Sequence, residues 1–91
     1  MKIRLTQKAE KCIKKIPFQI RKKFIKQLSL LEKNINHPSL RIKKMKNLER
    51  FEARIDYHYR FTFIVINNYI YILSIGPHDK ELGKNKKSSV D

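Results

Sequence analysis

The 91-residue sequence has few of the residues that cross-link a chain or bind phosphate through the backbone. It contains one cysteine, two glycines, three prolines and no tryptophan. A single cysteine excludes an intramolecular disulfide, and Cys12 falls at an apolar helical position where a buried, unreactive thiol is expected. Two glycines exclude a glycine-rich phosphate loop. The length fits one domain, residues 1–83, before a basic tail, residues 84–91, that we expect to be disordered.

Long hydrophobic runs are also missing. No apolar stretch approaches the roughly 20 residues needed to span a bilayer. Charged and apolar residues alternate from Met1 to Leu5, with no hydrophobic signal region behind them. We therefore expect a cytoplasmic protein with no membrane partner. Three scattered histidines and one thiol lack the paired spacing of a zinc site, so we expect no metal and no other cofactor.

Acidic residues are scarce, and the positive charge is concentrated in the first half of the chain. Lys and Arg number 22 against 8 Asp and Glu, which gives a formal net charge of +14. Residues 1–50 carry sixteen basic and three acidic side chains, whereas residues 51–91 carry six and five. Such an excess indicates a polyanionic partner: nucleic acid first, including ribosomal RNA, then an acidic protein, then a membrane surface. A codon bias toward lysine is the alternative source of the charge, but it does not favour arginine.

The apolar spacing in the first half predicts a short strand followed by two helices. Ile3 and Leu5 alternate with charged residues as in a strand, and Thr6 suits the N-cap of a helix. The first helix should end at Pro17. A longer apolar stripe then runs from Ile20 to Ile35, with lysines and an arginine on the opposite side. Together these segments predict a helical hairpin with one apolar and one basic face.

The second half alternates in the way of strands. Leu40 to Met45 is expected as an edge strand, Phe51 to Asp56 as a half-buried strand, and Phe61 to Ile66 as a central strand. Asn67-Asn68 suits a two-residue hairpin turn, after which Tyr69 to Ile75 returns as the partner strand. The predicted class is α+β, with the helical hairpin packed on one face of a small, mainly antiparallel sheet whose other face is more polar.

Two short stretches carry side chains suited to phosphate chemistry. Glu52 and Arg54 should project from one face of their strand, because side chains two residues apart share a face. Arg60 opens the next strand, and His78 follows the Gly-Pro that ends the last one. Arginine keeps its charge, whereas an imidazole gains or loses a proton near neutral pH. Two alternatives stay open: a solvated Glu52–Arg54 salt bridge and an ordinary surface role for His78.

RNA is a substrate that such side chains can cleave unaided, because its 2′-hydroxyl can attack the adjacent phosphorus. Arg54 and Arg60 suit the negative charge that develops there, and His78 suits proton transfer. Glu52 suits the role of base or that of holding Arg54 in place. His58, in the turn before Arg60, suits a phosphate contact.

At these residues the sequence resembles the RelE/ParE superfamily of toxins from bacterial type II toxin–antitoxin systems. Three stretches carry the resemblance over nearly the whole domain: Pro-Ser-Leu-Arg…Lys-Lys-Met-Lys, Arg-Ile-Asp…Tyr-Arg-Phe-Thr-Phe and Ile-Gly-Pro-His-Asp. The branch ending in Gly-Pro-His-Asp is the most similar. The resemblance implies the RelE/ParE-like fold and a ribosome-dependent endoribonuclease that cuts translated mRNA in the decoding site without metal. It also implies a cognate antitoxin, acidic or partly disordered, encoded next door.

The resemblance also implies roles by position. Arg60 matches the phosphate-contacting arginine of the family, Arg54 a basic strand residue, and His78 the basic or acid/base residue after the last strand. A basic stretch that can meet ribosomal RNA in relatives is matched by Lys43, Lys44 and Lys46. The sequence departs from many relatives in lacking an aromatic residue soon after Asp79, and some relatives have lysine where Glu52 stands.

Two other functions remain open beside the nuclease. ParE-like members share the fold but inhibit DNA gyrase by binding, and they generally lack the convergent arginine–histidine set. A non-catalytic basic binding module would keep the affinity for RNA without the cleavage.

Overall fold

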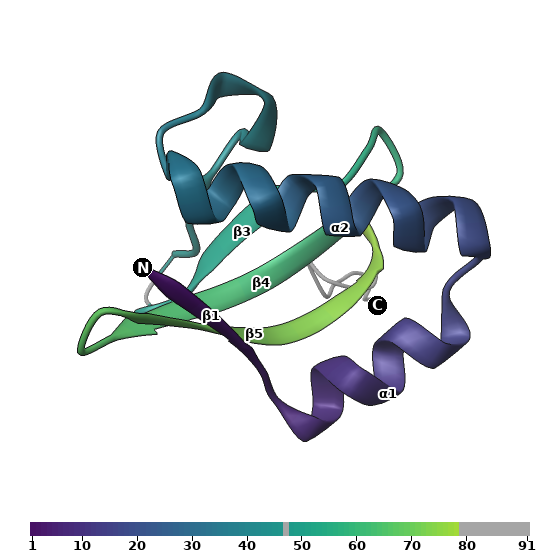
Figure 1. Ribbon diagram of the computed structural model, residues 1–91, viewed down its shortest axis with the longest axis horizontal. Coiled ribbons are helices and arrows are strands. Elements are labelled where there is room, and N and C mark those ends of the chain that lie inside the picture. The colour runs from purple at the N-terminus through teal and green to yellow at the C-terminus, as the bar shows by residue number, and fades with distance from the viewer. Residues whose placement is uncertain (47, 79–91) are drawn as a thin grey trace.

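The computed structural model describes residues 1–46 and 48–78, which form a five-stranded sheet with two helices packed against it (Figure 1). The strand order is β1-β5-β4-β3-β2. β1 pairs with β5 in parallel, and the other neighbouring strands are antiparallel. The strands are β1 (Lys2–Leu5), β2 (Lys43–Lys44), β3 (Phe51–Arg54), β4 (Tyr59–Ile66) and β5 (Tyr69–Pro77). The predicted α+β class is confirmed, whereas the predicted tail, residues 84–91, lies outside the described residues.

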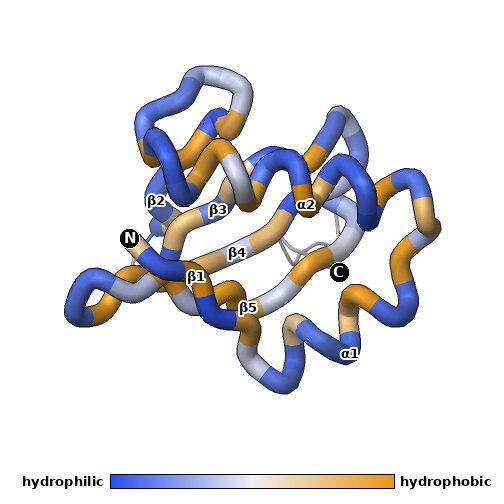
Figure 2. The backbone as a smooth tube through the Cα atoms, in the orientation of Figure 1, coloured by the Kyte–Doolittle hydropathy of each residue, from blue (hydrophilic) through white to orange (hydrophobic). Residues whose placement is uncertain are grey.

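The helical hairpin consists of α1 (Gln7–Lys15) and α2 (Phe18–Lys33), and both helices alternate between hydrophobic and hydrophilic segments (Figure 2). Thr6 is the N-cap of α1, as predicted: its Oγ1 accepts a hydrogen bond of 3.2 Å from the Ala9 N–H and donates one of 2.7 Å to the Ile72 carbonyl. This hydroxyl therefore joins the start of α1 to β5. Neither helix in the described part of the chain combines the length and apolar character needed to cross a bilayer.

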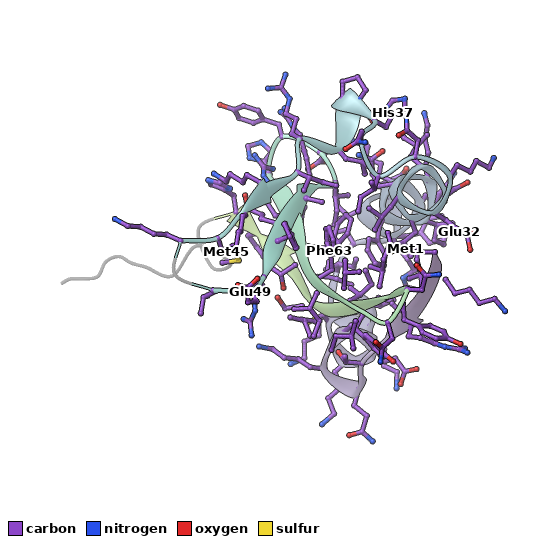
Figure 3. All side chains as sticks on the ribbon, turned by 90° about the vertical axis from the view of Figure 1, so that its left-hand side faces the viewer. Met1, Glu32, His37, Met45, Glu49 and Phe63 are labelled. Carbon is purple, nitrogen blue, oxygen red and sulfur yellow. The ribbon has the colours of Figure 1, made fainter. Side chains whose placement is uncertain are left out.

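The hydrophobic core lies between α2 and the sheet, where Figure 3 shows Phe63. Phe24 of α2 packs edge-on against Phe61, with ring centroids 5.3 Å apart. Gln27 is a buried polar residue of α2, and its Nε2 donates a hydrogen bond of 2.8 Å to the Arg54 carbonyl. Because a buried amide is costly without a partner, this bond fixes the end of β3 on the helix.

The chain between α2 and β3 differs from the predicted edge strand over Leu40 to Met45. Pro38–Leu40 is a 3-10 helix, Arg41 follows it in the left-handed conformation with φ 45°, and β2 has only two residues. Leu40 is fully buried in the core, so this segment turns inward before it can pair as a strand. The prediction was therefore wrong for Leu40 to Ile42 and for Met45.

The hairpin between β4 and β5 follows the sequence closely. Asn67 and Asn68 form the predicted two-residue turn, with φ of 48° and 72°. Positive φ at both positions matches the right-handed twist of the flanking strands. The two strands are longer than predicted, because β4 begins at Tyr59 and β5 continues to Pro77. These extensions bring the predicted site residues to the paired ends of the strands.

Candidate anion-binding site

The register of the three central strands places Arg54 beside Arg60. Arg54 of β3 lies directly opposite Arg60 of β4, and Arg60 lies opposite Gly76 of β5. Residues directly opposite one another in an antiparallel pair project from the same face of the sheet. Gly76 is buried and has no side chain opposite Arg60. Like charges in this arrangement repel each other, and an anion bound between them would relieve the repulsion.

The β3–β4 turn, residues 55–58, holds the Arg60 side chain. Arg60 Nη1 donates hydrogen bonds to the carbonyls of Asp56 at 2.6 Å, Tyr57 at 3.1 Å and Tyr59 at 3.1 Å. These acceptors are backbone carbonyls, so none of them places a negative charge beside the guanidinium. Within residues 1–46 and 48–78, no carboxylate forms an ion pair with Arg54 or Arg60. The strand ends thus carry two uncompensated positive charges.

Asp56 is the acidic residue of this turn, and its carboxylate binds Lys23 and two backbone N–H groups. Its Oδ1 accepts hydrogen bonds of 2.9 Å from the His58 and Tyr59 N–H groups, and its Oδ2 lies 3.3 Å from Lys23 Nζ on α2. Burial alone would raise the pKa of Asp56, but the two N–H groups and the Lys23 charge outweigh it and hold the pKa below its ordinary value. The carboxylate therefore stays ionised and stabilises the turn.

His78 lies next to His58 at the end of β5. The His78 N–H donates a hydrogen bond of 2.7 Å to the His58 carbonyl. The two histidines line a pocket of about 380 Å³ together with Tyr57, Arg60 and Pro77. His78 Nδ1 is buried and has no hydrogen-bond partner among the described residues, so none of them fixes the tautomer of the ring. The structure thus places Arg60, His58 and His78 around one pocket.

Glu52 differs from its expected place on a solvated face. It is only 2% exposed, and its Oε1 lies 3.8 Å from Lys43 Nζ, so the ion pair of Glu52 is with Lys43 and not the solvated one with Arg54 that was left open as an alternative. In Figure 3, Met45 and Glu49 lie on the side of the sheet away from α2. The Oε2 atom of Glu52 is buried and has no hydrogen-bond partner in the described part of the chain.

The row that contains Glu52 is polar across the sheet. Thr62 lies opposite Glu52 and Ser74 lies opposite Thr62, with their hydroxyl oxygens 2.6 Å apart. Both residues are buried. The sheet face away from α2 is therefore polar here, as predicted, but this row is shielded from solvent.

The predicted basic stretch lies along the outer edge of the sheet. Lys43 pairs with Glu52, and Lys44 Nζ lies 3.4 Å from Glu49 Oε1. All three lysines, Lys43, Lys44 and Lys46, are exposed. None of them is among the described residues that line the pocket beside His78. The stretch is thus a separate basic surface next to β3.

Tyr57 belongs to the pocket although the sequence did not single it out. Its side chain is 72% exposed. The Arg54 guanidinium carbon lies 5.7 Å from the centre of its ring, and the His58 ring packs edge-on against it with centroids 5.0 Å apart. The available signal was an aromatic residue inside a turn, where it cannot alternate into the core.

Solved structures share this fold. The YoeB dimer from Staphylococcus aureus is 24% identical with a TM-score of 0.68, and the match covers 87% of this chain and 98% of that one. A YoeB/ParE toxin from Agrobacterium tumefaciens is 13% identical with a TM-score of 0.73, covering 87% and 100%. The RelBE toxin–antitoxin complex from E. coli contains a chain that is 16% identical with a TM-score of 0.68, covering 86% and 96%.

The comparisons establish the fold. The chain matches no protein-family model and no curated protein sequence. At these identities the structural likeness concerns the arrangement of helices and strands, and the RelE/ParE-like fold expected from the resemblance is confirmed.

Proposed function

We propose that this chain is the toxin of a type II toxin–antitoxin pair and acts as a ribosome-dependent, metal-independent endoribonuclease on translated mRNA. The observation that carries the proposal is the Arg54–Arg60 pair near His78, which no carboxylate of the described residues neutralises. Two guanidiniums side by side suit a phosphate that gains negative charge in a transition state. The fold shared with the YoeB and RelBE structures supports the assignment as a toxin.

The proposed reaction uses the hydroxyl of the substrate as nucleophile. The 2′-oxygen loses its proton to a base and bonds to the adjacent phosphorus, the bond from phosphorus to the 5′-oxygen breaks, and an acid protonates that oxygen. The products are a cyclic phosphate and a free 5′-hydroxyl. Arg54 and Arg60 stabilise the phosphoryl oxygens, while His78 transfers a proton.

A second proton-transfer group is needed in this reaction, and we assign it to His58. His58 lines the pocket together with His78, whereas Glu52 is paired with Lys43 in the buried row. Glu52 then holds β2 against β3 through Lys43. This assignment replaces Glu52 as the candidate base and gives His58 a larger role than a phosphate contact.

The proposed partners follow from the charge. Translated mRNA is the substrate, and ribosomal RNA would contact the edge formed by Lys43, Lys44 and Lys46. A cognate acidic antitoxin would neutralise a protein of net charge +14. The E. coli structure of this fold is a toxin–antitoxin complex, which supports such a partner.

Primer extension on mRNA translated by purified ribosomes tests the function. We expect the wild type to produce cuts within codons, and both Arg60→Ala and His78→Ala to reduce the cutting rate by about a hundredfold or more. Arg50→Ala is the matched control, since Arg50 is exposed and does not line the pocket. A 2′-O-methyl group on the attacked nucleotide should abolish cutting.

The same variants separate the alternatives. A gyrase inhibitor would block DNA supercoiling in the absence of ribosomes and would tolerate His78→Ala. A binding module would bind ribosomes without cutting mRNA. Unchanged cutting by both Arg60→Ala and His78→Ala would refute the site assignment.

A further inference from the structure

We propose that Tyr57 is the surface on which a nucleobase next to the cleaved phosphate stacks. This inference rests on the proposed function and names the part of the substrate that the same site holds. Tyr57 exposes 72% of its side chain at the mouth of a basic pocket. Proteins that bind single-stranded RNA stack unpaired bases on such aromatic side chains, next to cations that hold the backbone.

The neighbours of the ring leave much of it accessible. The Arg54 guanidinium lies over the ring, with its central carbon 5.7 Å from the ring centre. The His58 ring is perpendicular to the Tyr57 ring, at an interplanar angle of 83°. Since Tyr57 is nevertheless 72% exposed, ring surface remains on which a base can stack. Arg60 and His78 line the same pocket, so that base belongs to a nucleotide adjoining the phosphate.

The turn that carries Tyr57 is rigid, which makes the ring a prepared platform. The Ile55 and Asp56 N–H groups both donate to the Tyr59 carbonyl, at 2.9 and 3.3 Å. Asp56 Oδ1 accepts two further N–H groups, and Arg60 Nη1 bonds to the Tyr57 carbonyl itself. A ring held in this way loses little conformational entropy when a base stacks on it.

The other large exposed apolar side chains lack this setting. Phe18 and Ile25 are 65% and 60% exposed, but they lie on α2 and do not line the pocket. Tyr69 also lies under an arginine, with the Arg4 guanidinium carbon 5.3 Å from its ring centre. Tyr69 begins β5 at the end opposite His78, and so it provides a matched tyrosine–arginine pair away from the pocket.

Fluorescence of 2-aminopurine tests the stacking independently of cleavage. The probe is placed in turn at each nucleotide of the decoding-site codon of a ribosome-bound mRNA, with 2′-O-methyl groups preventing the cut. We expect wild type and Tyr57→Phe to change the fluorescence at one position, and Tyr57→Ala to lose that change while still co-sedimenting with ribosomes. Tyr69→Ala should behave as wild type.

Cleavage kinetics measure how much the stacking contributes to the reaction. Loss of one base–aromatic stack should lower kcat/KM of Tyr57→Ala by about five- to a hundredfold, with Tyr57→Phe nearly unchanged. A fluorescence change in Tyr57→Ala equal to that of the wild type, or no responding position with wild type bound, would overturn the stacking role and leave the nuclease proposal standing. If the wild type neither co-sediments with ribosomes nor cuts mRNA, the proposed function fails, and this inference fails with it.

Discussion

Two acidic side chains of β3 and the β3–β4 turn form ion pairs with lysines. Asp56 pairs with Lys23 and Glu52 pairs with Lys43. Each carboxylate therefore neutralises a lysine of an adjoining element instead of an arginine of the pocket. Within residues 1–46 and 48–78, lysines around the site are therefore compensated, whereas Arg54 and Arg60 form no ion pair. This distribution suits the binding of a phosphate better than a high net charge alone would.

Replacing Asp56 with Asn tests how much the negative charge of this side chain stabilises the protein. Asn keeps an oxygen that accepts the His58 and Tyr59 N–H groups but loses the attraction to Lys23. We expect the free energy of unfolding at pH 7 to fall by about 0.5–1.5 kcal/mol, because charged acceptors make stronger hydrogen bonds than neutral ones. Urea unfolding measures the loss.

The pH dependence of Asp56→Asn has a definite sign. The folded state lowers the pKa of Asp56 below its ordinary value of 3.8, so the carboxylate stabilises the fold above that value. As the pH falls through the folded pKa, the wild type loses this contribution and the Asn variant has none to lose. The difference in unfolding free energy should therefore shrink below about pH 4. A difference that stays constant from pH 7 to pH 3 would contradict the assigned role.

Individual residues were predictable where their chemistry is local. Thr6 as a helix cap follows from the sequence, because a cap involves only residues a few positions away. The burial of Glu52 was not predictable, since alternation along one strand gives the face of a side chain but not whether that face is covered in the fold. Tyr57 was missed for a related reason. Its place in the pocket depends on residues of β3, β4 and β5, which are distant from one another in the sequence.

At the scale of elements, the site is built by the pairing of strand ends. The register places Arg54 opposite Arg60. Because β5 continues through Gly76 and Pro77, His78 follows at the same end of the sheet. The sequence predicted each strand but not this register. One extra residue interrupts the β4–β5 ladder near Thr62 and Phe63, and such a bulge shifts the pairing of every residue on one side of it. Spacing along a single strand does not reveal it.

Thr6→Ala tests how the elements are joined. The substitution removes the cap of α1 and the hydrogen bond to the Ile72 carbonyl of β5. We expect a loss of about 1–2 kcal/mol in the free energy of unfolding, because the terminus of α1 loses its cap and the Ile72 carbonyl keeps only the bond from the residue 6 backbone N–H. Thr6→Ser keeps the hydroxyl and should lie within about 0.5 kcal/mol of the wild type. Equal stability of the Ala and Ser variants would show that the hydroxyl is unimportant.

At the scale of the whole molecule, the charge is organised as two surfaces. One is the pocket lined by Arg60, with Arg54 opposite it on β3, and the other is the exposed edge with Lys43, Lys44 and Lys46. The net charge of +14 was visible in the sequence, but this division was not, because it depends on which lysines pair with acids. We expect the pocket to determine cleavage and the edge to determine affinity for the ribosome.

The double variant Lys44→Ala/Lys46→Ala separates these two roles. Each phosphate contact that is lost should reduce the slope of log affinity against log salt by about 1, so the double variant should bind ribosomes with a slope smaller by about 2. Lys43 is left unchanged, because its removal would leave the buried Glu52 carboxylate without that ion pair. The double variant should keep the stability of the wild type, since exposed ion pairs such as Lys44–Glu49 contribute little.

Lys11→Ala/Lys14→Ala is the matched control, because it removes the same charge from exposed positions on α1. Ribosome binding measured at several salt concentrations should show the smaller slope for the edge variant only. If both double variants lowered the slope equally, the net charge would act as a diffuse field, and the edge would have no specific contact with RNA.

With mRNA saturating and every toxin molecule bound, the edge variant should cut at the wild-type rate, because the Arg54–Arg60 pair and His78 are intact. A lower rate under those conditions would mean that the edge lysines also position the phosphate in the pocket.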